Sequence, residues 1–390
     1  MKCNWTTKRL SEIAYINPRE SLGKGVVAKK VPMDKLQPFC RDIPEFVLEE
    51  YKGGTKFRNG DTIMARITPC LENGKIAKVS VLSDGEVGFG STEYIVFRAI
   101  DGVSDADFLY YLICSPLVRN PAIKSMVGSS GRQRIQTDVV ANLDIELPPI
   151  EEQRKIGGLL KAIDDKIELN NAINNNLEQQ AQAIFSNEFL ILKVLPDGWK
   201  QNGLIDIADY LNGLAMQKHR PAVDETGIPV LKIKELRQGC CDDNSELCSP
   251  NIKSEYIIHD GDVIFSWSGS LLVDFWCGGV CGLNQHLFKV TSNNYDKWFY
   301  YAWTKHHLDR FIAVAVDKAT TMGHIKRDEL VKAEVLIPNE ADYNRIGALL
   351  QPIYDLIIAN RIENKRLAET RDTLLPKLMS GELDVSDIDL

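Results

Sequence analysis

The sequence contains the stretch LPPIEEQRKIGGLLKAIDDKIELNNAINNNLEQQAQAIF (residues 147–185) a second time, in diverged form, as IPNEADYNRIGALLQPIYDLIIANRIENKRLAETRDTLL (residues 337–375). The two copies align without a gap at a constant offset of 190 residues, so that Gly157 falls on Gly347 and Leu177 on Leu367. A repeat of this length indicates two equivalent halves on one polypeptide. Such a chain is suited to a partner that also has two halves.

Both copies have the apolar pattern of a coiled-coil helix. Acidic residues follow the proline near the start of each copy, where the positive end of a helix dipole favours negative charge. Apolar residues then recur at alternating spacings of four and three, at Ile156, Leu160, Ile163, Ile167, Leu177, Ala181 and Ile184 in the first copy and at Ile346, Leu350, Ile353, Ile357, Leu367, Leu374 and Leu378 in the second. This period is typical of a coiled-coil seam. We therefore expect two long helices that pair as an antiparallel coiled coil.

Four asparagines interrupt this seam at equivalent steps, Asn170 and Asn174 in the first copy and Asn360 and Asn364 in the second. An asparagine in a seam costs stability but specifies register, because a misaligned pairing leaves an amide without a partner in apolar surroundings. These four residues are therefore predicted to set the helix register. The alternative is a local rotation that turns the amides to water, and the sequence leaves it open.

The repeat extends more weakly beyond the helices, and its offset shifts there. Residues 107–111 match 297–301 at an offset of 190, residues 60–63 match 261–264 at 201, and Trp5 matches Trp199 at 194. Insertions therefore fall in the leading part of each half, while the helical part keeps its length. We predict an N-terminal domain over residues 1–147, a central helix over 148–189, a C-terminal domain over 190–336, and a C-terminal helix with a tail over 337–390.

Each leading domain is predicted to be mixed α/β. Short β-type runs lie at residues 63–67, 75–79, 94–97, 230–234 and 263–267. The aromatic runs at residues 108–113 and 298–303 have the character of short helices, and such aromatic side chains are more often core than surface. The predicted fold is thus a pseudo-two-fold repeat, in which two α/β domains are separated by two long helices.

The composition fits two ordinary cores, with 390 residues of which 44% are hydrophobic. No apolar run approaches the ~18 residues that span a membrane, and the first residues lack the apolar core of a signal peptide. Nine cysteines without a CxxC pair favour reduced thiols over disulfides or zinc. We therefore expect a cytoplasmic protein without a metal site.

The net charge of −8 at first sight opposes a nucleic-acid partner. The acidic excess is concentrated in the helical segments, because residues 148–190 carry 4 basic and 7 acidic side chains and residues 337–390 carry 6 and 10. Local basic patches in the two domains could still supply contacts to phosphates, so total charge decides little.

The first domain carries a glycine-rich basic loop with the sequence GSSGRQR at residues 128–134. Glycine lets the backbone approach a phosphate, and arginine and glutamine side chains can pair with guanine and adenine edges. At the equivalent place the second domain has TTMGHIKR at residues 320–327. A solvated surface turn is the alternative for each loop alone, and their equivalent positions favour contact with DNA.

The predicted DNA contacts combine these loops with basic and amide side chains elsewhere in the two domains. They are Arg66, Lys75, Ser129, Ser130, Arg132, Gln133 and Arg134 in the first domain, and Gln217, Lys218, Arg220, Lys232, Lys234, Arg237, Thr321, His324, Lys326 and Arg327 in the second. Trp267, Gln285 and His286 lie near turns and are weaker candidates. Basic side chains on strands are ordinarily just solvated, so each residue is a weak indicator by itself.

Motifs for catalysis are missing from the sequence. The sequence has no Asn or Asp followed by Pro-Pro and an aromatic residue, the motif that grips the amino group of a flipped adenine. It also has no GxxxxGK[ST] loop for ATP. Glu363 and Lys365 lie two residues apart on a predicted helix and therefore do not face one another as a nuclease pair would. We expect a chain that carries no chemistry of its own.

The order of the motifs resembles one family, the specificity subunits of type I restriction and modification systems. The resemblance lies in residues 147–156 (LPPIEEQRKI), 181–185 (AQAIF), 195–199 (LPDGW), 374–378 (LLPKL) and 380–383 (SGEL). It covers essentially the whole chain. The resemblance implies a DNA-binding subunit in which two target recognition domains each read half of a split, asymmetric sequence, while two helices fix the gap.

The resemblance also implies the partners. It implies double-stranded DNA, no membrane, two modification subunits that bind S-adenosylmethionine and methylate adenine, and two restriction subunits that use ATP and Mg. No cofactor is expected on this chain, which is not an enzyme by itself. The predicted partner-docking residues are Glu152, Gln153 and Tyr343, and because Tyr343 stands where the first copy has Gln153, the two docking sites could be unequal. A protein-binding scaffold with two adaptor domains on a helical hairpin is the alternative, and an unrecognised nuclease is a further one.

Overall fold

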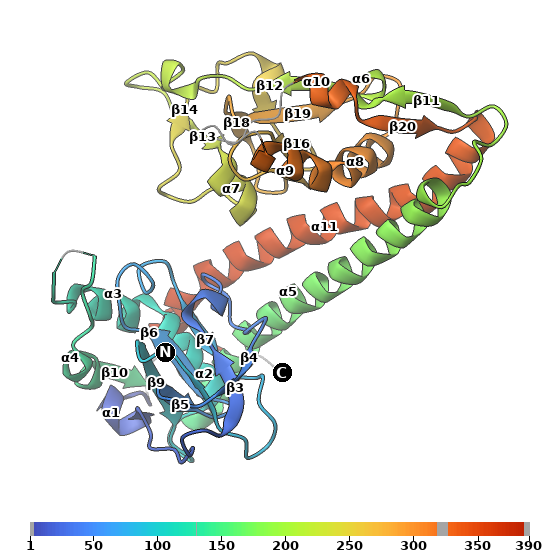
Figure 1. The fold of residues 1–390 in the computed structure, drawn as a ribbon. Coiled ribbons are helices and arrows are strands. Elements are labelled where there is room, and N and C mark those ends of the chain that lie inside the picture. Colours follow the sequence, from blue (N-terminus) through green and yellow to red (C-terminus); the bar gives the residue numbers. More distant parts are fainter. Residues whose placement is uncertain (1–3, 130, 318–326, 386–390) are drawn as a thin grey trace. The chain divides into compact units, whose positions relative to one another are not determined.

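The computed structural model describes residues 4–129, 131–317 and 327–385 (Figure 1). The chain forms two compact units, of which unit 1 comprises Met1–Glu168 and Leu367–Leu390, and unit 2 comprises Leu169–Arg366. Two long helices, α5 (Ile150–Phe185) and α11 (Glu340–Met379), each contribute one part to either unit. No helix in the described ranges is long and apolar enough to cross a bilayer.

Unit 1 contains two four-stranded sheets. One has the order β2-β9-β6-β7 and is antiparallel, and the other has the order β4-β3-β8-β5 with β3 and β8 parallel. Strands β1 and β10 form a separate antiparallel pair. The strands are β1 (Thr6–Arg9), β2 (Ala14–Ile16), β3 (Val27–Val31), β4 (Val47–Glu50), β5 (Thr55–Phe57), β6 (Thr62–Ala65), β7 (Ile76–Lys78), β8 (Gly88–Gly90), β9 (Tyr94–Ala99) and β10 (Asp144–Leu147). The shorter helices are α1 (Leu10–Ile13), α2 (Ala106–Cys114), α3 (Pro116–Lys124) and α4 (Thr137–Ala141), with a 3-10 turn at Met33–Lys35.

Unit 2 repeats this topology strand by strand. Its sheets have the orders β12-β19-β16-β17 and β14-β13-β18-β15, the latter with β13 and β18 parallel, and β11 pairs with β20. The strands are β11 (Lys200–Gly203), β12 (Asp209–Asn212), β13 (Ile228–Leu231), β14 (Leu247–Cys248), β15 (Ile257–Ile258), β16 (Val263–Ser266), β17 (Leu272–Phe275), β18 (Cys281–Leu283), β19 (Leu287–Thr291) and β20 (Glu334–Ile337). The shorter helices are α6 (Leu204–Ile207), α7 (Ile233–Gln238), α8 (Lys297–His306), α9 (Leu308–Asp317) and α10 (Arg327–Val331), with 3-10 turns at Met216–Lys218 and Ser254–Tyr256 and a short π-helix at Ser186–Leu190. The predicted fold class, a repeated mixed α/β domain with two long helices, is confirmed.

In each unit an aromatic helix covers a sheet. Helix α2 lies against β6, β7 and β9 in unit 1 and buries Phe108, Tyr110 and Tyr111 (Figure 1). Helix α8 lies against β17 and β19 in unit 2 and buries Trp298 and Phe299. The aromatic runs are therefore core, as the sequence predicts.

Each aromatic helix approaches a long helix at a glycine. A Cβ on Gly157 of α5 would lie 2.7 Å from the backbone nitrogen of Phe108, and a Cβ on Gly347 of α11 would lie 2.9 Å from Trp298 Nε1. Both distances are shorter than real Cβ contacts. The repeat therefore keeps glycine at this step because the aromatic helix occupies the space of a side chain.

The strand predicted at residues 230–234 is only partly correct. Strand β13 ends at Leu231, and α7 begins two residues later because Lys232 N donates to Glu235 Oε2 at 3.2 Å, which caps the new helix. The helix ends at Gly239, whose φ of +76° favours glycine. Glu235 and Gly239 both signal a helix in the sequence, but the preceding run of β-type residues favours a strand.

In unit 2 the asparagines meet across the two long helices. Asn360 Nδ2 donates to Asn174 Oδ1 at 2.8 Å, and Asn170 Nδ2 donates to Asn364 Oδ1 at 2.8 Å and to Glu363 Oε2 at 2.7 Å. Higher-numbered residues of α5 thus meet lower-numbered residues of α11, so the helices are antiparallel in this unit. Asn170, Asn174 and Asn360 are 0%, 6% and 8% exposed, so these amides lie inside the seam. That they set the register stays a prediction.

We predict that the pair of Asn174 and Asn360 behaves differently from its members. Replacing either one with leucine should lower the free energy of unfolding by about 1–3 kcal/mol, because the remaining amide stays buried without its partner. Replacing both with leucine should raise the melting temperature above that of the unchanged chain, because the buried polar pair is replaced by apolar contacts. Circular dichroism melts of the full chain measure this, and a double variant that melts below both single variants would contradict it.

Candidate DNA interface

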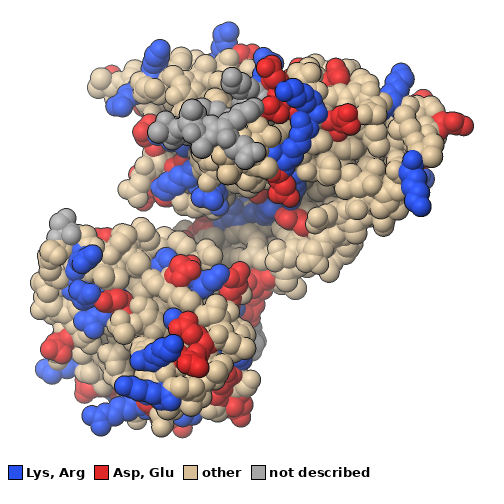
Figure 2. All heavy atoms as spheres, viewed as in Figure 1, with Lys and Arg blue, Asp and Glu red and all other residues tan. Residues whose placement is uncertain are grey.

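Basic and acidic side chains are interspersed on the visible faces of both units (Figure 2). The visible surface carries no extended patch of a single charge sign (Figure 2). The sites that could contact DNA must therefore be identified from individual side chains and the partners that these side chains have.

In unit 1 the glycine-rich loop is folded back against the end of β6. Arg134 forms β-bridges with Ile67 and with Val127. The backbone nitrogen of Gln133 donates to Thr68 Oγ1 at 3.1 Å, and Thr68 N donates to the Gln133 carbonyl, also at 3.1 Å. The loop is therefore held by main-chain contacts on both sides.

The side chains of this loop differ in how available they are. Ser129 and Arg132 are exposed, Gln133 is half-buried, and Ser130 lies outside the described residues. Arg132 makes no side-chain hydrogen bond or ion pair with any residue that the structure describes. Its guanidinium group is thus available for a phosphate or a base edge.

Arg134, in contrast, is committed to Glu93. Its Nε lies 3.0 Å from both carboxylate oxygens of Glu93, and its Nη2 lies 2.6 Å from Oε1. These hydrogen bonds hold the pKa of Glu93 below its usual value. That Arg134 contacts DNA stays a prediction, and a bidentate pair with a base through Nε and Nη2 requires Arg134 to release Glu93.

The two other candidates of unit 1, Arg66 and Lys75, differ in whether their side chains have hydrogen-bond partners. Arg66 follows β6 directly and is half-buried, and its Nε is buried without a hydrogen-bond partner in the described part of the chain. Lys75 donates from Nζ to the Met33 carbonyl at 2.8 Å. The half-buried amino group of Lys75 thus fastens the turn after β3, and its contact with DNA stays a prediction.

Two of the basic residues around α7 already pair with acidic side chains. Lys232 Nζ pairs with Glu246 Oε1 at 2.7 Å, and Lys234 Nζ pairs with Asp242 Oδ2 at 2.9 Å. Neither residue lies on a strand, which corrects their predicted setting. Arg237 is exposed in the last turn of α7 and remains a candidate.

The remaining candidates of unit 2 lie in surface segments. Gln217, Lys218, Arg220 and Arg327 are exposed, while Thr321, His324 and Lys326 lie outside the described residues. The turn with Gln217 and Lys218 is anchored by Met216, which is 1% exposed. Arg327 begins α10.

Unit 2 also has a polar cluster that the sequence marks only weakly. Trp267 Nε1 donates to Asn212 Oδ1 at 3.0 Å, and the Trp267 ring stacks on Phe288 at 5.6 Å. The imidazole of His286 lies with Nδ1 3.2 Å from the buried hydroxyl of Ser268. Single Trp and His residues near turns have many structural roles, so only the fold shows that they gather.

Among the described residues no group of His, Cys, Asp or Glu side chains is arranged to hold a metal ion.

The predicted docking residue Gln153 is 1% exposed and serves unit 1 internally. Its Oε1 accepts from Asp105 N at 3.0 Å, and its Nε2 donates to the carbonyls of Val103 (3.1 Å) and Pro148 (2.9 Å). Asp105 caps α2, so Gln153 fixes the start of α2 to α5. The prediction that Gln153 contacts a partner is corrected for this reason.

Tyr343 likewise fixes the start of α8 to α11 in unit 2, through a hydroxyl group in place of an amide. Its hydroxyl accepts from Asp296 N at 2.7 Å, and Asp296 precedes α8. Glu152 accepts from Trp5 Nε1 at 3.1 Å, just as Asp342 accepts from Trp199 Nε1 at 2.9 Å. The replacement of glutamine by tyrosine therefore preserves an internal contact, and an effect of this replacement on partner docking stays a prediction.

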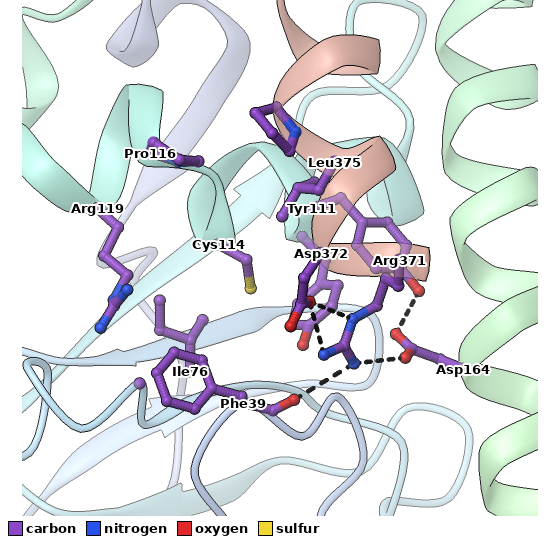
Figure 3. A pocket seen from close by; sticks show the side chains of 13 residues that line it. Phe39, Ile76, Tyr111, Cys114, Pro116, Arg119, Asp164, Arg371, Asp372 and Leu375 are labelled. Atoms are coloured by element: carbon purple, nitrogen blue, oxygen red, sulfur yellow. Dashed lines mark hydrogen bonds and ion pairs between the residues drawn. The ribbon is translucent and has the colours of Figure 1, made fainter. Parts of the chain in front are cut away.

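A second network joins α2, α5 and α11 in unit 1 (Figure 3). Arg371 Nη1 pairs with Asp164 Oδ1 at 2.8 Å, and the hydroxyl of Tyr111 donates to Asp164 Oδ2 at 2.6 Å (Figure 3). Asp164 is 4% exposed, and burial raises the pKa of Tyr111. A cavity of about 240 Å³ beside this network is lined mainly by apolar groups such as Ile76 and Leu375.

Comparisons with known proteins agree on one family. A family model described as "Type I restriction modification DNA specificity domain" matches residues 3–179 and again residues 196–369. The specificity subunit of the type I restriction enzyme MjaIX of Methanocaldococcus jannaschii is 26% identical over 316 residues, which cover 74% of this chain and 71% of that protein. The HindI specificity subunit of Haemophilus influenzae is 21% identical and covers 84% of this chain and 87% of its own.

A solved structure shares the fold. The crystal structure of the type I restriction-modification system S subunit from M. genitalium superposes with a TM-score of 0.56 at 14% identity, over 96% of both chains. At this identity the likeness concerns the fold alone.

Arg132 and Arg134 should respond differently to substitution. Arg132→Ala should weaken binding to duplex DNA and reduce the slope of log affinity against log salt by about 1, as for the loss of one phosphate contact. Arg134→Ala should weaken binding because it uncovers the Glu93 carboxylate, and adding Glu93→Gln should restore most of that loss. Binding titrations at several salt concentrations measure both. If Glu93→Gln rescues Arg132→Ala equally well, or fails to rescue Arg134→Ala, this division is wrong.

Gln153→Ala should lower the free energy of unfolding by about 1–3 kcal/mol, because Asp105 N and two carbonyl groups lose their partner. The neighbouring exposed residue Arg154 supplies the control, and Arg154→Ala should stay within about 0.5 kcal/mol of the unchanged chain. Denaturant titrations of the full chain test this. A Gln153→Ala chain as stable as the Arg154→Ala control would refute the internal role.

Proposed function

The chain belongs to the type I restriction modification DNA specificity family, and on this premise we propose how it selects the DNA on which a type I restriction–modification complex acts. It is the specificity subunit, which is the non-catalytic member of such a system. In the proposal, unit 1 and unit 2 each bind one half of a split target in double-stranded DNA.

The observation that carries the proposal is the strand-by-strand repetition of one frame with unlike surfaces. Both units have the same two sheet orders and the same parallel strand pair. The sequence differs between equivalent places of the two halves, as GSSGRQR at residues 128–134 and TTMGHIKR at residues 320–327 illustrate. Unlike side chains read unlike bases, so the proposed target is asymmetric as well as interrupted.

We further propose that the long helices set the gap between the two halves of the target. With 36 residues, α5 is about 54 Å long at a rise of 1.5 Å per residue. One turn of B-DNA is about 34 Å. The helix is thus long enough to separate two reading units by more than one turn.

The chemistry of the complex is assigned to partners in this proposal. Modification subunits bind S-adenosylmethionine and methylate adenine, and restriction subunits use ATP and Mg. This chain binds none of these cofactors. Because the substrate is the DNA inside the cell, the proposed location is the cytoplasm.

A modification subunit needs a surface on this chain, and unit 2 offers an exposed apolar stripe on its two helices. We call this the docking stripe, and its members are Leu169 and Ile173 of α5 and Leu349, Pro352, Leu356 and Ala359 of α11. The exposed fractions of the four large side chains are 55% for Leu169, 37% for Ile173, 47% for Leu349 and 45% for Leu356. Contiguous exposed apolar residues of this kind mark interaction sites.

The members of the docking stripe face the same side of the helix pair. Each one directly precedes a residue of the seam, as Ile173 precedes Asn174 and Leu356 precedes Ile357. In an antiparallel pair of right-handed helices, the residues one position before the seam point to a common side. The spacings of three and four residues along α11 suit a helix of the partner, laid along the stripe.

The two copies of the repeat differ at the stripe. At the positions of Pro352 and Leu356, the first copy has Ala162 and Lys166. We therefore propose that the two modification subunits dock with unequal affinity, and that this difference originates at Lys166 and not at Gln153.

Leu356→Glu should weaken assembly with the modification subunit more than about 10-fold, because a charge enters the centre of an apolar contact. Val223→Glu is the matched control, since Val223 is fully exposed in unit 2 and outside the stripe. Lys166→Leu should strengthen assembly at the other site. Sedimentation titrations with the modification subunit measure all three. Equal assembly by the Leu356→Glu chain and its control would rule out the docking stripe.

The proposed function as a whole is tested by selection from a pool of random DNA duplexes. The chain together with its modification subunits should enrich two unlike short sequences at a fixed separation. Its affinity should fall steeply as salt rises, because phosphate contacts release counterions. Salt-independent binding without sequence preference would instead favour a protein-interaction scaffold.

A further inference from the structure

The two units place a polar corner at the same position of the fold. In unit 1 the last residue of β6, Ala65, pairs with the first residue of β9, Tyr94. In unit 2 the last residue of β16, Ser266, pairs with the first residue of β19, Leu287. The residues that continue from these paired ends are therefore structurally equivalent. They are Arg66, Thr92 and Glu93 in unit 1, and Trp267, Gln285 and His286 in unit 2.

The corner of unit 1 is a hollow of about 450 Å³. Three cationic side chains line it, Arg19, Lys56 and Arg66, together with the polar side chains of Asn17 and Thr92. Arg19 is exposed and has no side-chain partner among the described residues. Arg66 is half-buried, with a buried Nε, and its guanidinium group makes no hydrogen bond or ion pair with the described residues.

The hollow does not supply its own counter-ion for these cations. Glu20 is the only carboxylate among the described residues that line it. Its Oε1 pairs with Arg98 at 2.6 Å, and its Oε2 pairs with Arg58 at 2.8 Å. Glu93, beside Arg66, is paired with Arg134. The corner therefore presents positive charge to an anion or to a base edge that accepts hydrogen bonds.

The corner of unit 2 is built from neutral groups. Gln285 and His286 are half-buried, and Gln285 Nε2 lies 3.4 Å from His286 Nε2. The backbone nitrogen of Gln285 donates to the Leu214 carbonyl at 2.8 Å. A Cβ on Gly213 would lie 2.2 Å from the Asn284 carbonyl oxygen, so glycine permits this close crossing of segments.

This corner is also held rigidly. Ser268 orients the imidazole of His286, and Asn212 and Phe288 fix the ring of Trp267 beside it. A polar group that is positioned by its neighbours discriminates between bases better than one on a free loop. The two corners thus combine a shared position with different hydrogen-bonding chemistry.

We infer that these two equivalent corners are the base-reading sites of the two units, an inference that rests on the proposed function. In unit 1 the Arg66 guanidinium reads a guanine edge, and Arg19 holds an adjoining phosphate. Lys56 adds its charge, while its Nζ donates to the Glu20 carbonyl at 3.0 Å. In unit 2 the Gln285 amide reads an adenine, with which glutamine forms a bidentate pair. His286 supports Gln285 and acts as a positioning residue.

The test is selection from random duplexes by the full chain together with its modification subunits. Gln285→Ala should lower the preference at one base pair of one half-site by about 5- to 150-fold and leave the other half-site unchanged. Arg66→Lys keeps the charge but loses the planar fork of donors, so it should lower a preference for guanine in the opposite half-site only. His286→Ala should lower the preference at the same base pair as Gln285→Ala does.

Matched controls lie in each unit away from the corners. Gln201 is exposed on β11 and Arg9 is exposed on β1, and Gln201→Ala and Arg9→Lys should leave both half-sites unchanged. Thermal melts establish that each variant is folded, and Arg66→Lys retains the charge and most of the volume of the half-buried residue.

The possible results separate the inference from the proposed function. If Gln285→Ala and Arg66→Lys still select the same split sequence as the unchanged chain, the corners do not read bases, although the proposed function stands. If they weaken all sequences alike, the corners contact phosphates only, and the inference is again overturned. If the unchanged chain selects no sequence at all, the proposed function itself fails.

Discussion

The rest of the structure depends on the pairing of α5 with α11. An apolar seam alone would allow the helices to slide by one repeat, because one leucine replaces another at little cost. The buried amide contacts are predicted to oppose such a slide, because it would separate Asn360 from Asn174 and Asn170 from Asn364. An inserted residue would turn every later side chain by about 100° and separate these pairs. The predicted register role agrees with a repeat that runs over 39 residues without a gap, while its offset shifts in the leading part of each half.

In each unit the contacts with the long helices are kept between the two halves, whereas the side chains at the corners differ. Gln153 and Tyr343 use different atoms for one task, the attachment of an aromatic helix to a long helix. The corners show the reverse, since equivalent positions hold a guanidinium group in unit 1 and an indole in unit 2. The contact between an aromatic helix and a long helix is therefore kept even when the residue that makes it changes. At the corners the backbone is kept, and the chemistry of the side chains changes.

The sequence predicts those features that depend on neighbours along the chain. The seam, its asparagines and the aromatic core follow from local periodicity and composition. The roles of Gln153 and Arg134 could not be predicted, because their partners lie 48 and 41 residues away and are brought close only by folding. Lys232 and Lys234 are a different case, since Glu235 and Gly239 signal a helix, but a run of β-type residues precedes them. Trp267 and His286 gain meaning only when the fold gathers them.

The glycines where the aromatic helices touch the long helices bear on how such a chain can be recombined. Gly157 receives α2, and Gly347 receives α8, so each aromatic helix fits the long helix that follows it in the sequence. A chimaera of two relatives joined at Pro148 would part α2 from the helix surface shaped for it. A junction between Glu168 and Leu169 would leave each aromatic helix with its own glycine, provided that no residue is gained or lost. The module of unit 1 that keeps its own contacts therefore comprises residues 1–168 together with residues 367–390, because the end of α11 packs in the core of that unit.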